Sequence, residues 1–255
     1  MAEVLMVTET FLLTMAFGVG LFMPIADSKL TGVGLVKLII TVALVPLLIS
    51  TILYLRYADA FILPSYLHYI PMICMVLVRL FHQDEKSLFM WLLYFIQNAS
   101  LLYLIVLTFN HHGLTYLYFL SSTFLLGIII YSMLLGHYYL VVPKLTVRPL
   151  LIANIILFVV LALKITQAGY FTYQNFDFFT EGTTKGAGYS FNWLMLLMRA
   201  GWGYLVIGIM SIFNWKLVKL RSTQSATGML YAMTFFVIIG ELCAQYMYFS
   251  FGMFL

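Results

Sequence analysis

The stretch 194-LMLLMRAGWGYLVIGIM-210 places a single arginine, Arg199, inside an otherwise apolar run. An arginine at the centre of a membrane helix costs about 2.5–3.5 kcal/mol on insertion scales, so it needs a partner or water. The rest of the chain also indicates a lipid environment. Of its 255 residues 64% are hydrophobic and 9% charged, whereas soluble domains carry roughly 25% charged residues. We therefore expect an all-α, polytopic transmembrane helix bundle.

Eight apolar segments are long enough to cross a bilayer, which takes about 20 residues. Few residues separate the second segment from the third, so seven spans are an alternative. No connection is long enough to hold a soluble domain, and residues 1–255 are expected to form a single integral membrane domain. The expected spans are 4–24, 33–55, 61–81, 87–109, 114–142, 147–168, 190–214 and 225–250.

The positions of lysine and arginine predict the orientation, because cytoplasmic loops carry an excess of both. The odd-numbered connections and their flanks hold nine, namely Lys29, Lys37, Arg79, Lys86, Lys144, Arg148, Lys216, Lys219 and Arg221. The even-numbered ones hold three, namely Arg56, Lys164 and Lys185. Both termini are therefore expected outside, in a bacterial-type inner membrane. The cations follow the ends of apolar runs and form no patch, so no nucleic-acid partner is expected.

The last two expected spans form a hairpin about Leu220, and this hairpin predicts a partner for Arg199. Arg199 lies 21 residues before Leu220, and Glu241 lies 21 residues after it. Helices rise by about 1.5 Å per residue, so in an antiparallel pair both side chains reach the same depth. Two interpretations stay open: the pair only fixes packing, or it belongs to a ligand or ion pathway, as intramembrane ionisable groups often do.

Further polar side chains are expected in the outer half of the bilayer. They are Glu9, His68, Gln97, Asn98 and Gln245. Together with Arg199 and Glu241 they would form an intramembrane ligand-binding cluster open to the outer side, provided that their helices converge. Depth follows from the sequence, but lateral position does not.

The five histidines raise the alternative of haem b. His68 and His82 lie 14 residues apart, about 21 Å along a helix, which is much the spacing of the two stacked haems in membrane cytochromes b. The opposite ligands would come from His111 or His112, and from His137. However, His82, His111 and His112 lie at expected helix ends, where solvated interfacial imidazoles are the simpler interpretation.

A second cluster is expected at the inner face, in 136-GHYYLVVPKLTVRPL-150. Its candidate residues are His137, Tyr138, Lys144 and Arg148. At headgroup depth they would suit a quinone head or a lipid phosphate, or they would simply anchor the helix ends.

Three functional hypotheses follow. The leading one is a membrane subunit or accessory protein of a respiratory or redox pathway. It would interact with quinone or haem and with other membrane or redox subunits in electron transport, without catalytic activity of its own. The alternatives are a secondary transporter or channel that uses the Arg199–Glu241 pair, and a membrane scaffold or assembly factor. The sequence contains no P-loop, zinc-protease, nucleophile-elbow or EF-hand motif.

Overall fold

The computed structural model describes residues 2–25, 31–81, 88–109, 115–142 and 145–255, and every regular element among them is helical. The elements in chain order are α1 (Ala2–Leu21), η1 (Met23–Ile25), α3 (Val33–Tyr54), α4 (Leu63–Phe81), α5 (Leu88–Phe109), α6 (Thr115–Val141), α7 (Arg148–Gln174), η3 (Phe176–Phe179), α8 (Tyr189–Ala200), η4 (Gly201–Val206), α9 (Ile207–Lys219) and α10 (Thr223–Phe251).

Among the described residues eight helical segments are long and apolar enough to cross a membrane, which confirms the all-α bundle and the count of eight. α8, η4 and α9 together make one of these segments, Tyr189–Lys219. Apolar runs fold this way because lipid offers no partner for backbone N–H and C=O groups, which a helix pairs internally. Two expected boundaries were wrong: α7 continues to Gln174 and α9 to Lys219, beyond the expected ends at 168 and 214.

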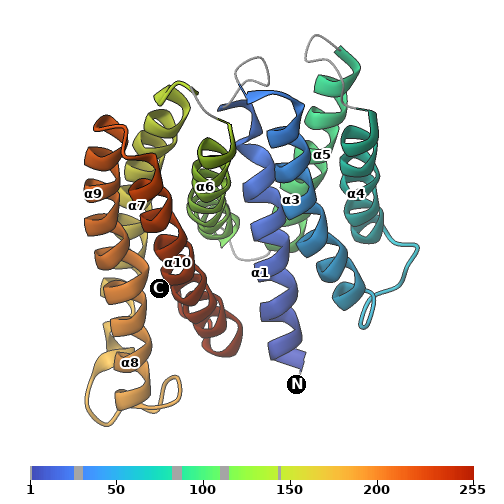
Figure 1. Cartoon of the computed structure of the whole chain (residues 1–255). Coiled ribbons are helices and arrows are strands. Elements are labelled where there is room, and N and C mark those ends of the chain that lie inside the picture. Colours follow the sequence, from blue (N-terminus) through green and yellow to red (C-terminus); the bar gives the residue numbers. More distant parts are fainter. Residues whose placement is uncertain (1, 26–30, 82–87, 110–114, 143–144) are drawn as a thin grey trace.

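α6 is the central helix of the bundle, and it packs against α1, α10, α7, α5 and α3 (Figure 1). All residues from 125 to 132 are buried. At one crossing Gly127 meets Gly18 of α1, and a Cβ on Gly127 would lie only 2.4 Å from the Cα of Gly18. The two backbones therefore touch, as small residues permit in membrane helices.

The remaining helices lie on two sides of α6. α1, α3, α4 and α5 form one side, and α7 to α10 form the other (Figure 1). The start of α1, the connection 175–188 and the end of α10 lie at the same end of the bundle, which is called the lower end, as drawn in Figure 1. The opposite end is called the upper end.

The chain turns back after α10. Gly252, with φ +68°, ends the helix in the left-handed conformation that glycine adopts without strain. The last three residues then pack into the bundle, with Met253 and Leu255 buried. The ring of Phe254 stacks on Phe171 of α7, at a centroid distance of 4.5 Å. The segment 252–255 is called the tail.

Candidate functional site

Arg199 and Glu241 form the ion pair that the hairpin geometry predicts. Nη2 of Arg199 donates to Oε1 of Glu241 at 2.7 Å, and both side chains are fully buried. The helices come close here because glycines lie at the crossing. A Cβ on Gly240 of α10 would lie only 2.7 Å from the Cα of Gly203. Gly203 belongs to the π-helical segment η4, which begins two residues after Arg199. Such segments are rare and frequently mark functional or strained sites.

Lys164 joins this pair, although the sequence predicts it in the flank of an outer connection. That placement is wrong, because α7 continues for ten residues beyond Lys164, to Gln174, and Lys164 is completely buried. Its Nζ donates to Oγ of Ser122 at 2.7 Å and to the carbonyl oxygen of Tyr118 at 3.2 Å. It also lies 3.5 Å from the centroid of the Tyr118 ring. Hydroxyl, carbonyl and ring face thus take the place of water around the ammonium group.

Two tyrosines and the tail complete the surroundings of Arg199. Its Nε donates to the hydroxyl of Tyr204 at 2.8 Å and to the backbone oxygen of Leu255 at 3.3 Å. The hydroxyl of Tyr118 donates to the same Leu255 oxygen at 3.2 Å. We call Lys164, Arg199, Glu241, Tyr118 and Tyr204 the ionic cluster. It ties α6, α7, α8, η4, α10 and the tail together.

Glu9 and His68 form a separate polar cluster toward the lower end. Oε1 of Glu9 accepts a hydrogen bond from Ser50 at 3.2 Å and lies 3.9 Å from Nε2 of His68. Oε2 accepts from Thr10 at 3.3 Å and from the hydroxyl of Tyr57 at 3.4 Å. Burial raises the pKa of Tyr57, in the connection after α3, above its ordinary value, so this hydroxyl keeps its proton. Several donors therefore converge on one buried carboxylate.

The imidazole of His68 is enclosed by protein groups. Its Nδ1 lies 3.4 Å from the hydroxyl of Thr51, and its ring stacks on Tyr54 at a centroid distance of 4.7 Å. With Nε2 directed at Glu9, neither ring nitrogen is presented to an open space that a haem iron would need. In this arrangement His68 is not available as the haem ligand that the histidine spacing suggested.

A cavity of about 530 Å³ opens beside Glu9. One part of its wall is polar and another part is apolar, and Glu9 itself is 6% exposed. The polar part consists of Glu9, Thr10, Tyr54, Tyr57 and Thr108, and the apolar part of Met6, Leu63, Pro64, Leu107 and Phe249. Largely apolar walls with a few convergent polar groups are typical of small-molecule sites.

The other residues expected in the outer cluster lie apart from both clusters. Gln97 of α5 is buried, and neither atom of its amide has a hydrogen-bond partner among the described residues. Asn98 donates to the carbonyl oxygen of Tyr94 at 2.8 Å. Gln245 of α10 donates to Thr14 of α1 at 3.4 Å. The structure thus places the expected residues in several local arrangements, of which only those at Arg199 and Glu9 gather ionisable groups.

The candidate residues of the inner face point to different neighbours. Nδ1 of His137 lies 3.0 Å from the hydroxyl of Tyr231, at an exposed position. The hydroxyl of Tyr138 instead donates to the backbone oxygen of Thr31 at 2.6 Å. Arg148 is exposed at the start of α7. Four further candidates, Lys144, His82, His111 and His112, lie outside the described residues.

Fold and sites together define a polytopic helical bundle of the kind that spans membranes, with ionisable side chains buried between its helices. Comparison with known proteins adds no family, since no family model, no curated protein and no solved structure matches the chain.

Proposed function

We propose that this chain is a membrane protein that binds the head group of a quinone in the cavity beside Glu9. It would act as a subunit or accessory protein of a redox pathway. The observation that carries the proposal is the carboxylate of Glu9 on the cavity wall, with the imidazole of His68 next to it. The ionic cluster around Arg199 is assigned a structural role, because all three of its charged side chains are fully buried.

The chemistry of a quinone suits this cavity. Its ring is apolar, and its two carbonyl oxygens accept hydrogen bonds, for which the carboxyl of Glu9 is a donor when it holds a proton. The hydroxyls of Thr10, Tyr57 and Thr108 donate within the protein, to Glu9 and to the carbonyl oxygen of Leu104, and would have to turn from these acceptors to reach a ligand. Two-electron reduction of a quinone consumes two protons, and a carboxylate next to an imidazole is able to relay protons. The proposal gives this chain binding and proton exchange, while electrons come from a partner redox subunit.

Titration of the purified protein with a short-chain ubiquinone analogue tests the proposal. We expect saturable binding that Glu9→Leu weakens by about two- to tenfold, because the substitution removes the hydrogen bond that the protonated carboxyl donates to a quinone oxygen, and such a bond contributes about 0.5–1.5 kcal/mol. Glu3→Leu is the matched control, since Glu3 lies on the same helix in an exposed position. Binding that is absent in the wild type, or that both variants affect equally, would contradict the proposal and favour a scaffold without a small ligand.

The proposal places the lower end outside, in a bacterial-type inner membrane. The positions of the described lysines and arginines outside the ionic cluster support this. Lys37, Arg79, Arg148, Lys216, Lys219 and Arg221 lie toward the upper end, and Arg56 and Lys185 toward the lower end. In intact cells a membrane-impermeant maleimide should label the E181C variant but not K219C. The two native cysteines are buried and leave a low background. The reverse labelling pattern would overturn the orientation.

A proton- or cation-coupled transporter is the second candidate, and two prolines favour it. Pro46 and Pro71 lie inside α3 and α4, close to Ser50 and His68. A proline inside a helix leaves a carbonyl one turn earlier without its backbone donor, and transporters often bind substrate at such interrupted helices. Proteoliposomes distinguish the two: a transporter shows wild-type proton flux that Glu9→Gln abolishes, without quinone binding.

Haem b forms no part of the proposal. An absorbance spectrum of the purified protein checks this point directly. A Soret band would mean that histidines outside the described residues, or a rearranged His68, ligate haem.

A further inference from the structure

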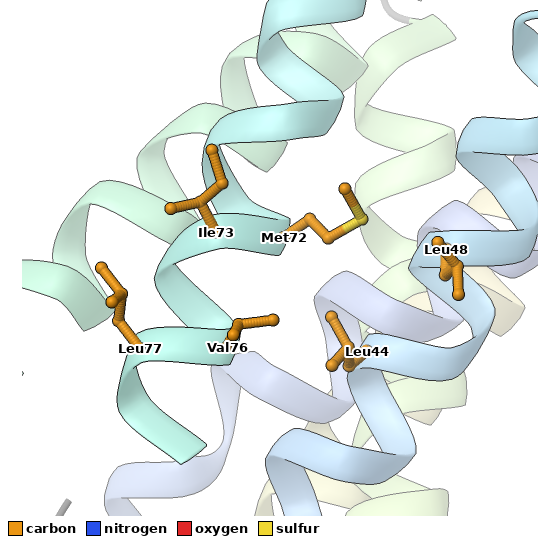
Figure 2. A pocket seen from close by; sticks show the side chains of 6 residues that line it. All are labelled: Leu44, Leu48, Met72, Ile73, Val76 and Leu77. Atoms are coloured by element: carbon orange, nitrogen blue, oxygen red, sulfur yellow. The ribbon is translucent and has the colours of Figure 1, made fainter. Parts of the chain in front are cut away.

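An apolar groove of about 280 Å³ runs between α3 and α4. Met72 and Val76 extend from α4 toward α3, where Leu44 and Leu48 form the opposite wall (Figure 2). Ile73 and Leu77 also line the groove. Val76 is 37% exposed and Leu48 45% exposed, so the groove faces the surroundings of the bundle. It shares no lining residue with the cavity beside Glu9.

Two cations lie at the upper end of this groove. Arg79 is near the end of α4, and its Nη1 donates to Oγ1 of Thr41 at 2.5 Å and to the backbone oxygen of Lys37 at 3.5 Å. Lys37 lies near the start of α3, so the two cationic residues are neighbours on adjacent helices at the upper end of the bundle. Both bonds use only one nitrogen of the guanidinium, which has five N–H donors in all.

The spacing along the helices aligns the cations with the groove. Val76 and Met72 lie about 5 and 10 Å below Arg79, and Leu44 about 10 Å below Lys37, at about 1.5 Å of rise per residue. We infer that the groove binds an acyl chain of an anionic phospholipid, whose phosphate lies against Lys37 and Arg79. Both parts of the ligand are required: an aliphatic chain for an aliphatic groove, and negative charge for two adjacent cations at headgroup depth.

The positive charges of Lys37 and Arg79 favour an anionic phospholipid over other apolar ligands. A second helix would fill the groove but would leave two cations against its end that form no ion pair with any described residue. A zwitterionic lipid brings a positive group beside its phosphate and so attracts the cations less. A free phosphate has no part that contacts Leu44, Met72 or Val76.

Native mass spectrometry of the detergent-purified full chain tests the inference, with phosphatidylglycerol and phosphatidylcholine of equal chain length added in turn. We expect a tightly retained phosphatidylglycerol molecule and much weaker retention of phosphatidylcholine. The K37Q/R79Q variant should bind phosphatidylglycerol about thirtyfold more weakly, because each cation near the headgroups contributes about fivefold. K216Q/K219Q, which removes two cations from the same end of the bundle on α9, should bind it as the wild type does.

A variant that keeps both cations provides an independent check on the groove. Val76→Phe fills the groove from a partly exposed position, where the larger side chain does not disturb the core. It should lower retention of phosphatidylglycerol, and glycerol 3-phosphate should neither bind the wild type nor compete. Equal retention of both lipids, unchanged preference in K37Q/R79Q, the same loss in K216Q/K219Q, or competition by the free headgroup would each overturn the inference.

Discussion

Arg199 and Lys164 bring two basic side chains into the bundle against one acidic side chain, that of Glu241, and all three are fully buried. Removing one partner of a buried pair leaves the other charge without compensation, which costs about 3–5 kcal/mol. Glu241→Gln should therefore lower the free energy of unfolding by about that amount. The measurement is equilibrium unfolding of the purified protein in mixed micelles.

The double variant R199Q/E241Q is the informative control for this prediction. It removes both charges of the pair and leaves Lys164 with Ser122 and Tyr118. It should therefore be more stable than E241Q alone. A double variant as unstable as the sum of its two single variants would show that the charges do not act as a pair.

Asp177 and Lys185 give a prediction on pH dependence in the connection at the lower end. The hydrogen bond from Lys185 holds the pKa of Asp177 below its ordinary value. The folded-state pKa thus lies below the unfolded one, so the stabilisation is complete above the ordinary range of aspartate. It is lost as the pH falls below about 4. Melting temperatures of wild type and Asp177→Asn should differ at pH 6 and converge in acid.

The exposed carboxylate of Glu181, in the same connection, supplies the control for that comparison. The melting temperature of Glu181→Gln should differ from that of Asp177→Asn at pH 6 and should converge with it in acid, as the melting temperature of the wild type does. If Asp177→Asn and the wild type differ equally at every pH, the ion pair makes no contribution of its own.

The residues of the two clusters differ in how far the sequence reveals them. Arg199 and Glu241 were predictable as a pair because a hairpin relates their depths by counting alone. Lys164 was not, because the aromatic residues up to Gln174 resemble a connection and concealed six further residues of helix. The contact of Glu9 with His68 depends on how α1, α3 and α4 are arranged side by side in the bundle. The pattern of residues along a single helix does not reveal this arrangement.

At the scale of elements, the contact between α1 and α6 depends on glycine. A Cβ on Gly127 would lie 2.4 Å from the Cα of Gly18, and neither atom can rotate away without moving its helix backbone. Gly127→Ala should thus force the helices apart and destabilise the bundle by about 1–3 kcal/mol. Unfolding in micelles measures the change.

A second helical glycine provides the matched substitution. Gly169 of α7 has no atom within 4 Å of the position that a Cβ would take. Gly169→Ala should leave stability unchanged or raise it by about 0.5–1 kcal/mol, since alanine restricts the unfolded chain. Equal losses for both variants would mean that close approach at Gly127 is not what decides the packing.

The elements themselves were readable from the sequence to different degrees. Eight apolar runs of the right length are sufficient to predict eight spans, because lipid permits few alternatives to a helix. The π-helical segment at Gly201–Val206 was not predictable, since nothing in its residues distinguishes it from an α-helix with two glycines. It coincides with the place where Gly203 packs against Gly240 beside Arg199.

At the scale of the molecule, the tail links parts of the bundle that lie far apart in the sequence. Phe254 packs against Phe171 of α7 and lies 5.0 Å, centroid to centroid, from Tyr118 of α6. The backbone oxygen of Leu255 accepts hydrogen bonds from Tyr118 and Arg199. No pattern along the chain predicted this return, because three apolar residues after a helix resemble its frayed end.

Phe254→Ala should therefore loosen the tail and destabilise the folded chain by about 2–3 kcal/mol, somewhat less than for a fully buried phenylalanine. Phe235→Ala is the control, since Phe235 lies on α10 and is 60% exposed, so in a membrane its ring contacts lipid in place of protein. Unfolding in micelles gives both values, and proteolysis from the C-terminal side reports whether the tail has left the bundle. Because Leu255 contacts Arg199, the loss in Phe254→Ala should shrink when Arg199 is already replaced by glutamine. Losses that simply add would show that the tail packs beside the ionic cluster without supporting it.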